Sequence, residues 1–97
     1  MQTKVTFRHF NSQHPELHNM AIDEASGFEK YFDGIISADV EFINESNKIV
    51  EFRVQVQGNT LVAKEGSEDF KKSLGLASDK MVRMLRKWKT KRFANKH

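Results

Sequence analysis

The clearest hydrophobic pattern in the chain lies between residues 68 and 92. Its apolar side chains are three or four residues apart, at Phe70, Leu74, Ala77, Met81, Leu85 and Trp88. Because an α-helix turns once every 3.6 residues or so, this spacing places all of them on one stripe. Ser67 precedes the segment as a candidate N-cap, and the acidic Glu68 and Asp69 suit the positive end of the helix dipole. We therefore expect a long amphipathic helix whose stripe faces a core.

Two further patterns come earlier in the chain. Residues 2 to 8 alternate between apolar and polar, which predicts a strand. Pro15 then favours the start of a helix, because proline fits the first turn. The apolar positions that follow are Leu17, Ala21, Ala25, Phe28 and Phe32. Their spacing predicts a helix of about five turns that ends near Gly34.

Three β-rich runs fill the middle of the chain, at residues 35–44, 49–56 and 60–65. The second run alternates most regularly, with Val50, Phe52, Val54 and Val56 predicted to face inward and Glu51, Arg53, Gln55 and Gln57 outward. The stretch 44–48 predicts a turn. Gly58-Asn59 is typical of a two-residue hairpin loop. These runs therefore predict three consecutive strands.

Together the segments predict an α+β fold with the order β-α-β-β-β-α. An antiparallel four-stranded sheet would bury one face under both helices and leave the other face polar. The same layout occurs in double-stranded-RNA-binding domains, although a shared fold does not determine function. With 97 residues and 38% hydrophobic content, the chain can build one modest core. We expect a single domain, residues 1–97, with 92–97 as a frayed tail.

Charge is distributed unevenly along the chain. Residues 1–69 contain 6 Lys and Arg against 12 Asp and Glu, a net of −6, whereas residues 70–97 contain 10 against 1, a net of +9. On the long helix, Lys80, Arg83, Lys87 and Lys91 form a row that Arg86, Lys89 and Arg92 broaden. Like charges four residues apart weaken a helix by about 0.2–0.5 kcal/mol per pair. Such an arrangement indicates a polyanionic partner.

Three stretches of the sequence form a recognisable set of motifs. They are IISADVEF, GNTLVAKE followed by EDF, and the ending DKMVRMLRKWKTK. They resemble the ribosome hibernation-promoting factor family, whose usual ending is close to DKLERQLRKYKDK. The positions that match this ending are Asp79, Lys80, Arg83, Leu85, Arg86, Lys87, Lys89 and Lys91. Lys71, Gly75 and Met84 depart from the family pattern, which usually has Tyr, Asp and Gln there.

The resemblance implies a translation inhibitor that acts under poor growth. Such a protein enters the small ribosomal subunit and occupies the channel for messenger RNA and the anticodon ends of transfer RNA. Contacts with ribosomal RNA would come from Arg8, Lys30, Lys80, Arg83, Arg86, Lys87, Lys89, Lys91 and Arg92. The chain resembles the short type of the family, because longer members continue into a second domain. We expect it to be a monomer when free.

Other interpretations of the same residues stay open. The lysine-rich surface could be merely solvated, or could dock on a membrane or an acidic protein. Trp88 could stack on a base, but its phase favours packing at the rim of the core. His14 and His18 have a spacing that can hold a metal, yet no third ligand is evident. A general double-stranded RNA-binding or protein-interaction module therefore remains the second hypothesis.

Composition bounds the remaining classes. The absence of cysteine excludes disulfides and thiolate metal sites. No apolar run approaches the length of about 18 residues that a membrane span needs. Adjacent acidic residues such as Asp23 and Glu24 point in different directions, so we expect no catalysis. The sequence predicts a cytoplasmic protein with no cofactor, no metal and no small-molecule substrate.

Overall fold

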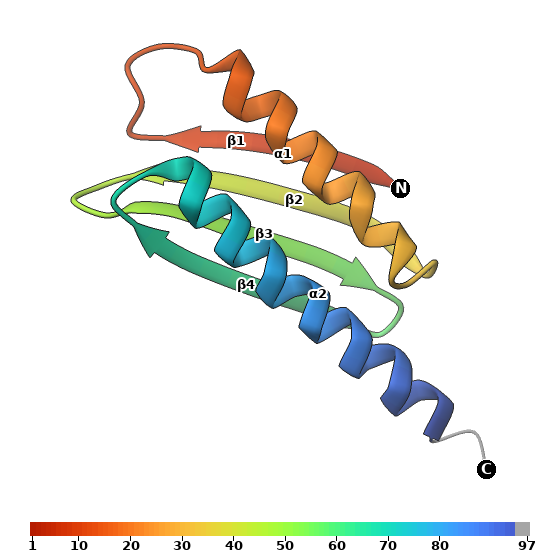
Figure 1. Ribbon diagram of the computed structural model, residues 1–97. Helices are drawn as coiled ribbons and strands as arrows, with labels where there is room; N and C mark the ends of the chain where they lie inside the picture. Colours follow the sequence, from red (N-terminus) through yellow and green to blue (C-terminus); the bar gives the residue numbers. More distant parts are fainter. Residues whose placement is uncertain (95–97) are drawn as a thin grey trace.

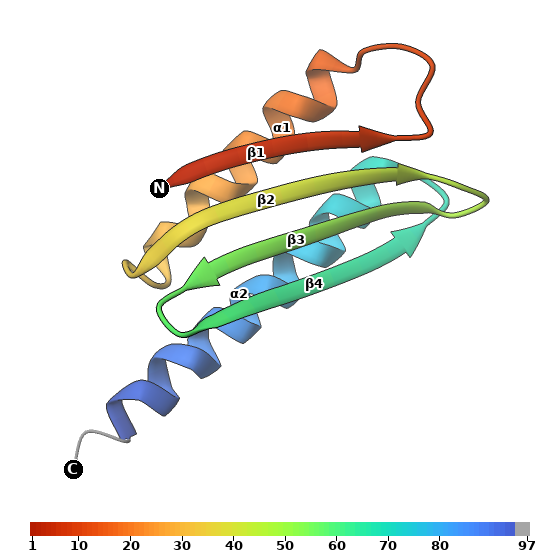
Figure 2. The same ribbon diagram turned by 180° about the vertical axis from the view of Figure 1, so that it is seen from behind.

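The computed structural model describes residues 1–94, with side chains described as far as Lys91. Its elements are β1 (Gln2–Arg8), α1 (Pro15–Gly27), the 3-10 turn η1 (Phe28–Lys30), β2 (Ile35–Asn44), β3 (Lys48–Val56), β4 (Asn59–Ser67) and α2 (Phe70–Ala94). Both helices cover one face of a four-stranded sheet, and the opposite face is bare (Figures 1 and 2). The predicted α+β fold and its element order are confirmed.

The sheet is mixed, which corrects the expectation of an antiparallel one. Its strand order is β1-β2-β3-β4, and the last three strands pair antiparallel through short turns. β1 instead pairs with β2 in parallel, in a register that joins Val5 to Val40 and Phe7 to Phe42. The reason lies in the connection: α1 carries the chain back across the sheet, so β2 starts from the same end as β1.

The core lies between the covered face of the sheet and the apolar stripes of the two helices. Val50, Phe52, Val54 and Val56 are at most 1% exposed, so the predicted inward face of β3 is confirmed. Phe28 packs edge-on against Phe52, with ring centroids 5.0 Å apart. The core therefore holds both helices against the centre of the sheet.

The first helix is shorter than its apolar spacing predicted. α1 ends at Gly27, and the chain then tightens into η1. Glycine has low helix propensity, and a 3-10 turn is a common way for a helix to finish. Phe28, at the start of this turn, is buried against the sheet.

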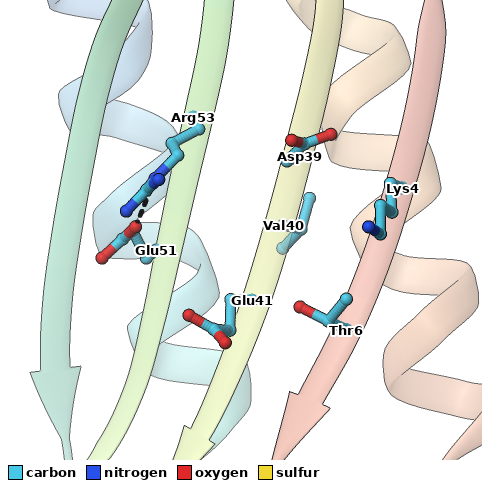
Figure 3. Close-up of a pocket in the computed structure, with 7 residues that line it drawn as sticks. All are labelled: Lys4, Thr6, Asp39, Val40, Glu41, Glu51 and Arg53. Atoms are coloured by element: carbon cyan, nitrogen blue, oxygen red, sulfur yellow. Dashed lines mark hydrogen bonds and ion pairs between the residues drawn. The ribbon is translucent and has the colours of Figure 1, made fainter.

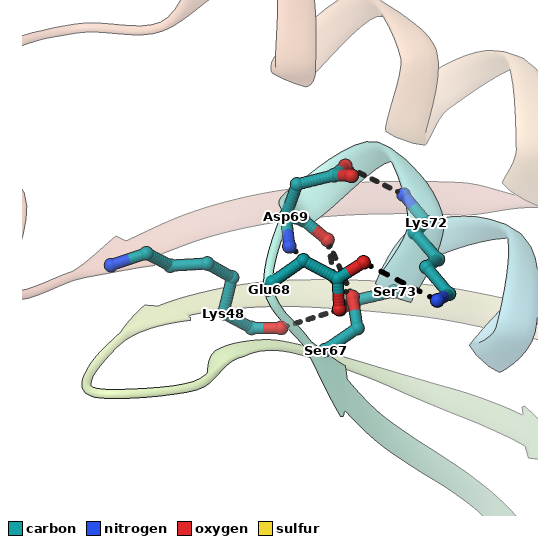
Figure 4. A network of polar contacts seen from close by, with 6 residues as sticks. All are labelled: Lys48, Ser67, Glu68, Asp69, Lys72 and Ser73. Carbon is teal, nitrogen blue, oxygen red and sulfur yellow. Dashed lines mark hydrogen bonds and ion pairs between the residues drawn. The ribbon is translucent and has the colours of Figure 1, made fainter.

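Asp69, and not Ser67, caps the start of α2 (Figure 4). The backbone N–H of Lys72 donates to Oδ1 of Asp69 at 2.9 Å. Ser67 is still the last residue of β4, and its hydroxyl donates to the Asp69 carbonyl and contacts the Ser73 hydroxyl. Ser73 in turn donates to the Lys48 carbonyl. These hydrogen bonds attach the first turn of α2 to the ends of β3 and β4.

Two other boundaries differ from the sequence expectation. The loop between β3 and β4 consists of Gln57 and Gly58, because Val56 already pairs with Asn59. Gly58 has φ +82°, a left-handed conformation that glycine adopts without strain. The backbone of α2 is helical to Ala94, past the residue 92 at which a frayed tail was expected. Residues 95–97 of that expected tail lie outside the described part of the chain.

The length of α2 gives the molecule its shape. Twenty-five helical residues span about 37 Å, whereas the nine residues of β4 span about 30 Å. The C-terminal part of the helix therefore continues past the sheet, as both ribbon views show (Figures 1 and 2). None of the described helices combines the length and apolarity needed to cross a lipid bilayer.

Candidate nucleic-acid interface

The buried stripe of α2 fixes the direction in which its charged side chains point. Leu74, Met81 and Leu85 are at most 1% exposed. Trp88, one turn further, is partly buried against the same core, so its expected place at the core rim is confirmed. Because these residues hold one side of the helix, its cations must occupy the remaining sides.

Cations in the first part of α2 are already paired with carboxylates. Lys71 contacts Glu16 of α1 at 2.9 Å, and Lys72 contacts Glu68 at 3.3 Å. The interaction with Glu16 raises the pKa of Lys71 above its usual value. Lys80, one of the predicted RNA-binding residues, lies 3.4 Å from Glu65 of β4. These charges are partly neutralised by the protein itself.

The last part of α2 carries cations without such partners. The residues concerned are Arg83, Arg86, Lys87, Lys89 and Lys91, which we call the distal cationic surface. All are exposed, and among the described residues none of them forms an ion pair. Arg86 lies over the ring of Tyr31, 5.2 Å from its centroid. The side chain of Arg92, also predicted to bind RNA, lies outside the described residues.

The distal cationic surface wraps around the helix instead of forming one row. Lys87 and Lys91 lie on the side of β4, where they line a groove together with Leu61. Arg86 lies on the side of η1, over Tyr31. A phosphate chain could therefore be contacted from more than one side of this helix end.

Lys30 is the last residue of η1. It is exposed, and with Tyr31 it lines a depression between the two helices. Glu24 and Asp79 line the same depression, so it is bounded by negative charge. Lys30 directly precedes Tyr31, the residue on which Arg86 packs. Sequence reasoning did not single out Tyr31, whose only signal is its place next to Lys30.

Arg8 lies elsewhere. It faces the bare side of the sheet, because strand alternation turns its neighbour Phe7 toward the core. Its guanidinium donates two hydrogen bonds to the Glu41 carboxylate, at 2.7 and 3.2 Å. The hydrogen bond from Arg8 lowers the pKa of Glu41 below its usual value. The sheet thus separates Arg8 from the distal cationic surface.

Comparison with known protein families connects this geometry to a group of proteins. The sequence profile of the family described as "Sigma 54 modulation protein / S30EA ribosomal protein" matches residues 3–92. The chain belongs to this family. The match confirms the resemblance to hibernation-promoting factors that the sequence motifs indicated. The S30EA family is a family of ribosome-associated proteins.

Solved structures show the same fold. A ribosomal subunit interface protein from Coxiella burnetii is 24% identical, with a TM-score of 0.84 over 93% of this chain and 99% of its own. The N-terminal domain of Protein Y from Thermus thermophilus is 17% identical, with a TM-score of 0.80 over 91% of this chain and 99% of its own. At these identities the likeness establishes the fold. No curated protein matches the chain significantly.

The bare face of this S30EA fold carries charges of both signs (Figure 3). Glu41 and Glu51 stand directly opposite each other on neighbouring strands. Like charges in this arrangement repel, but Arg8 pairs with Glu41 and Arg53 donates to Glu51 at 2.8 Å. Glu51, expected to be solvated, is only 9% exposed as a result of this packing. The bare face is therefore largely self-neutralised.

Of the two histidines considered as metal ligands, His14 takes part in aromatic packing. The His14 ring meets Phe10 edge-on, with centroids 4.9 Å apart, and lies 6.2 Å from Phe7. In the part of the chain that the structure describes, no group of three His, Asp or Glu is placed to hold a metal ion. Within the described residues of this S30EA protein, the distal cationic surface gathers five exposed cations that no carboxylate pairs.

Proposed function

We propose that this protein binds the small ribosomal subunit, occupies the channel for messenger RNA and transfer RNA, and thereby inhibits translation. Membership of a ribosome-associated family supports the ribosome as partner. The observation that carries the proposal is the distal cationic surface: five exposed cations on the C-terminal part of α2, unpaired among the described residues. A charge arrangement of this kind needs an anionic partner to offset its self-repulsion.

Ribosomal RNA suits this surface because its phosphates are regularly spaced and densely charged. Each phosphate that a Lys or Arg neutralises releases condensed counterions into solution. The cations lie on several sides of one rigid helix, which favours contacts with the RNA backbone over the reading of bases. Recognition would then depend on the shape of the folded RNA more than on its sequence.

Residues on both faces of the molecule can take part if the partner surrounds it. Lys30 lies on the helix side, where it lines the depression between the two helices, whereas Arg8 lies on the bare face of the sheet. A single RNA duplex could contact one of these faces, but the walls of a channel could contact both. The narrow, elongated shape, 51 × 23 × 19 Å, also suits insertion into a channel.

The inhibition that we propose is steric, and it needs binding but no reaction. A protein that fills the channel excludes messenger and transfer RNA simply by its volume. The protein would act in the cytoplasm as a monomer, without cofactor, metal or small-molecule substrate. Lys80, held by Glu65, would contribute only after that weak surface pair opens.

Sedimentation with purified small subunits at two or more salt concentrations tests the proposal. If about five phosphates are neutralised, log affinity should fall with log salt at a slope of roughly −3.5 to −4.5. Arg83→Glu with Lys87→Glu should abolish co-sedimentation, because both changes replace attraction with repulsion. Lys71→Glu with Lys72→Glu makes the same change in net charge at the other end of α2 and should bind far better.

The opposite results would reject the proposal in distinguishable ways. A flat salt response would remove the electrostatic argument. A folded distal double variant that still co-sediments would show that another surface binds the subunit. Tight binding to free duplex RNA without preference for the subunit would favour a general RNA-binding module instead.

A further inference from the structure

A groove runs between the edge strand β4 and the distal part of α2. It is lined by Leu61, Met84 and Trp88, with the exposed Lys87 and Lys91 beside them, and has a volume of about 230 Å³. Leu61 is 8% exposed, so it forms a packed apolar floor. The groove therefore combines apolar walls with two cations of the distal cationic surface.

The indole of Trp88 is held in this groove by packing alone. Its Nε1–H is buried and finds no acceptor among the described residues. No hydrogen bond to a described residue therefore fixes this ring, which is uncommon for a buried donor in a folded protein. Because Trp88 is only partly buried and lines the groove, the accessible part of its ring can meet a second flat group there.

We propose that the groove takes one unpaired RNA base, stacked on Trp88, while Lys87 and Lys91 contact the adjoining phosphates. This inference rests on the proposed function and adds a subsite to it. An RNA base has a flat apolar face and lies between two phosphates, which matches an apolar groove flanked by two cations. Lys87 and Lys91 are separated by about 6 Å along the helix, so they can engage successive phosphates of one strand.

Charge and shape together favour single-stranded RNA over the other anionic partners. An acidic peptide would complement Lys87 and Lys91 but would bring no flat face for Trp88. Duplex RNA would supply phosphates, but its bases are stacked on each other and cannot enter the groove. The subsite should therefore distinguish a single strand from a duplex of the same charge.

Trp88 is the one tryptophan of the chain, so its fluorescence reports on this groove alone. Titration with single-stranded oligoadenylate should quench the emission and saturate, because a stacked base quenches an indole. A duplex RNA of equal phosphate number and a polyglutamate peptide of equal charge should leave the emission nearly unchanged. Equal quenching by the duplex or the peptide would overturn the inference.

Variants separate stacking from charge. Trp88→Leu keeps an apolar side chain but removes the flat surface, and should weaken oligoadenylate binding by about fivefold to a hundredfold. Lys87→Gln with Lys91→Gln should weaken both binding and quenching, whereas Lys71→Gln with Lys72→Gln removes the same charge away from the groove and should preserve quenching. The lysine variants leave the apolar core intact, so they test the inference even if Trp88→Leu folds poorly.

Binding curves with small subunits distinguish failure of the subsite from failure of the proposed function. If the wild-type protein and a folded Trp88→Leu variant bind subunits equally, the base subsite is wrong and the proposed function stands. If the wild-type protein does not bind subunits but oligoadenylate quenches Trp88, the proposed function is wrong and the groove remains a single-strand site. If the folded Trp88→Leu variant binds subunits more weakly than the wild-type protein does, the result supports both the base subsite and the proposed function.

Discussion

Arg8 and Lys87 carry the same charge, and their surroundings decide what each can bind. Arg8 is held by Glu41 through two hydrogen bonds on the bare face of the sheet. Lys87 is exposed beside the apolar groove, without an ion pair among the described residues. An incoming phosphate meets a free cation at Lys87, but at Arg8 it must compete with a carboxylate. Whether a cation is free of an internal ion pair therefore decides how well it can bind phosphate, more than whether it belongs to a motif.

Removing Arg8 should show how far the lowered pKa of Glu41 depends on it. Arg8→Gln should raise the pKa of Glu41 toward its ordinary value, because its main hydrogen-bond partner is lost. Since the folded-state pKa of Glu41 is lowered, the pair stabilises the protein above the unfolded-state pKa and stops doing so as pH falls through the folded-state pKa. The loss of stability at neutral pH should be small, as for other exposed ion pairs.

Carboxyl titration by NMR and urea unfolding at neutral and acidic pH would check this expectation. The two proteins should converge in stability once Glu41 is protonated in both. A Glu41 pKa that does not move, or a stability difference that grows in acid, would contradict the assigned pair.

Within α2, sequence spacing was enough to locate the buried stripe but not the helix boundaries. The stripe follows from hydrophobic periodicity, which any amphipathic helix must satisfy. Ser67 and Asp69 are both good N-cap residues, and the choice between them depends on how far β4 pairs with β3. Tertiary pairing of this kind is not encoded in local spacing, so the cap was assigned to the wrong residue.

The two sides of α2 should differ sharply in their effect on stability. Met81→Ala or Leu85→Ala removes a side chain that is fully buried, which should lower the free energy of unfolding by about 2–5 kcal/mol. Lys87→Ala alters an exposed position and should change it by no more than about 0.5 kcal/mol. Chemical denaturation measures both, and the reverse ranking would overturn the assignment of the helix faces.

Gly75 offers a test of the helix backbone itself. It lies within α2, and a Cβ added there would meet no heavy atom within 4 Å apart from its chain neighbours and the helix backbone. Gly75→Ala should therefore stabilise the protein by about 0.5–1 kcal/mol through higher helix propensity. Gly58→Ala is the matched control and should destabilise it, because Gly58 has φ +82°. A lower melting temperature for Gly75→Ala than for the wild-type protein would contradict this expectation.

Across the whole molecule, the sequence predicted the layers but not the direction of β1. Alternation of apolar and polar residues marks a strand without saying which way it runs. The helical connection between β1 and β2 did contain the answer, since such a crossover joins parallel strands. The separation of Arg8 from the distal cationic surface could not be predicted from the sequence, because it depends on the assembled sheet. The same is true of the groove beside Trp88.

The same assembly divides the charge of the protein between two faces. On the bare face, Arg8 pairs with Glu41 across β1 and β2, and Arg53 pairs with Glu51 within β3. On the C-terminal part of α2, five exposed cations stand without such partners among the described residues. A polyanion is therefore attracted mainly to one end of an elongated molecule, which gives binding a direction as well as a charge.

Competition in a translation assay would show whether the protein acts by occupying the channel for messenger and transfer RNA. If it does, translation inhibited by the protein should recover as messenger RNA and initiator transfer RNA are added in excess, and the ribosomal RNA should remain intact. The Arg83→Glu, Lys87→Glu double variant should fold but not inhibit. Inhibition that no excess of messenger and transfer RNA relieves, or that is accompanied by cleaved ribosomal RNA, would contradict the account.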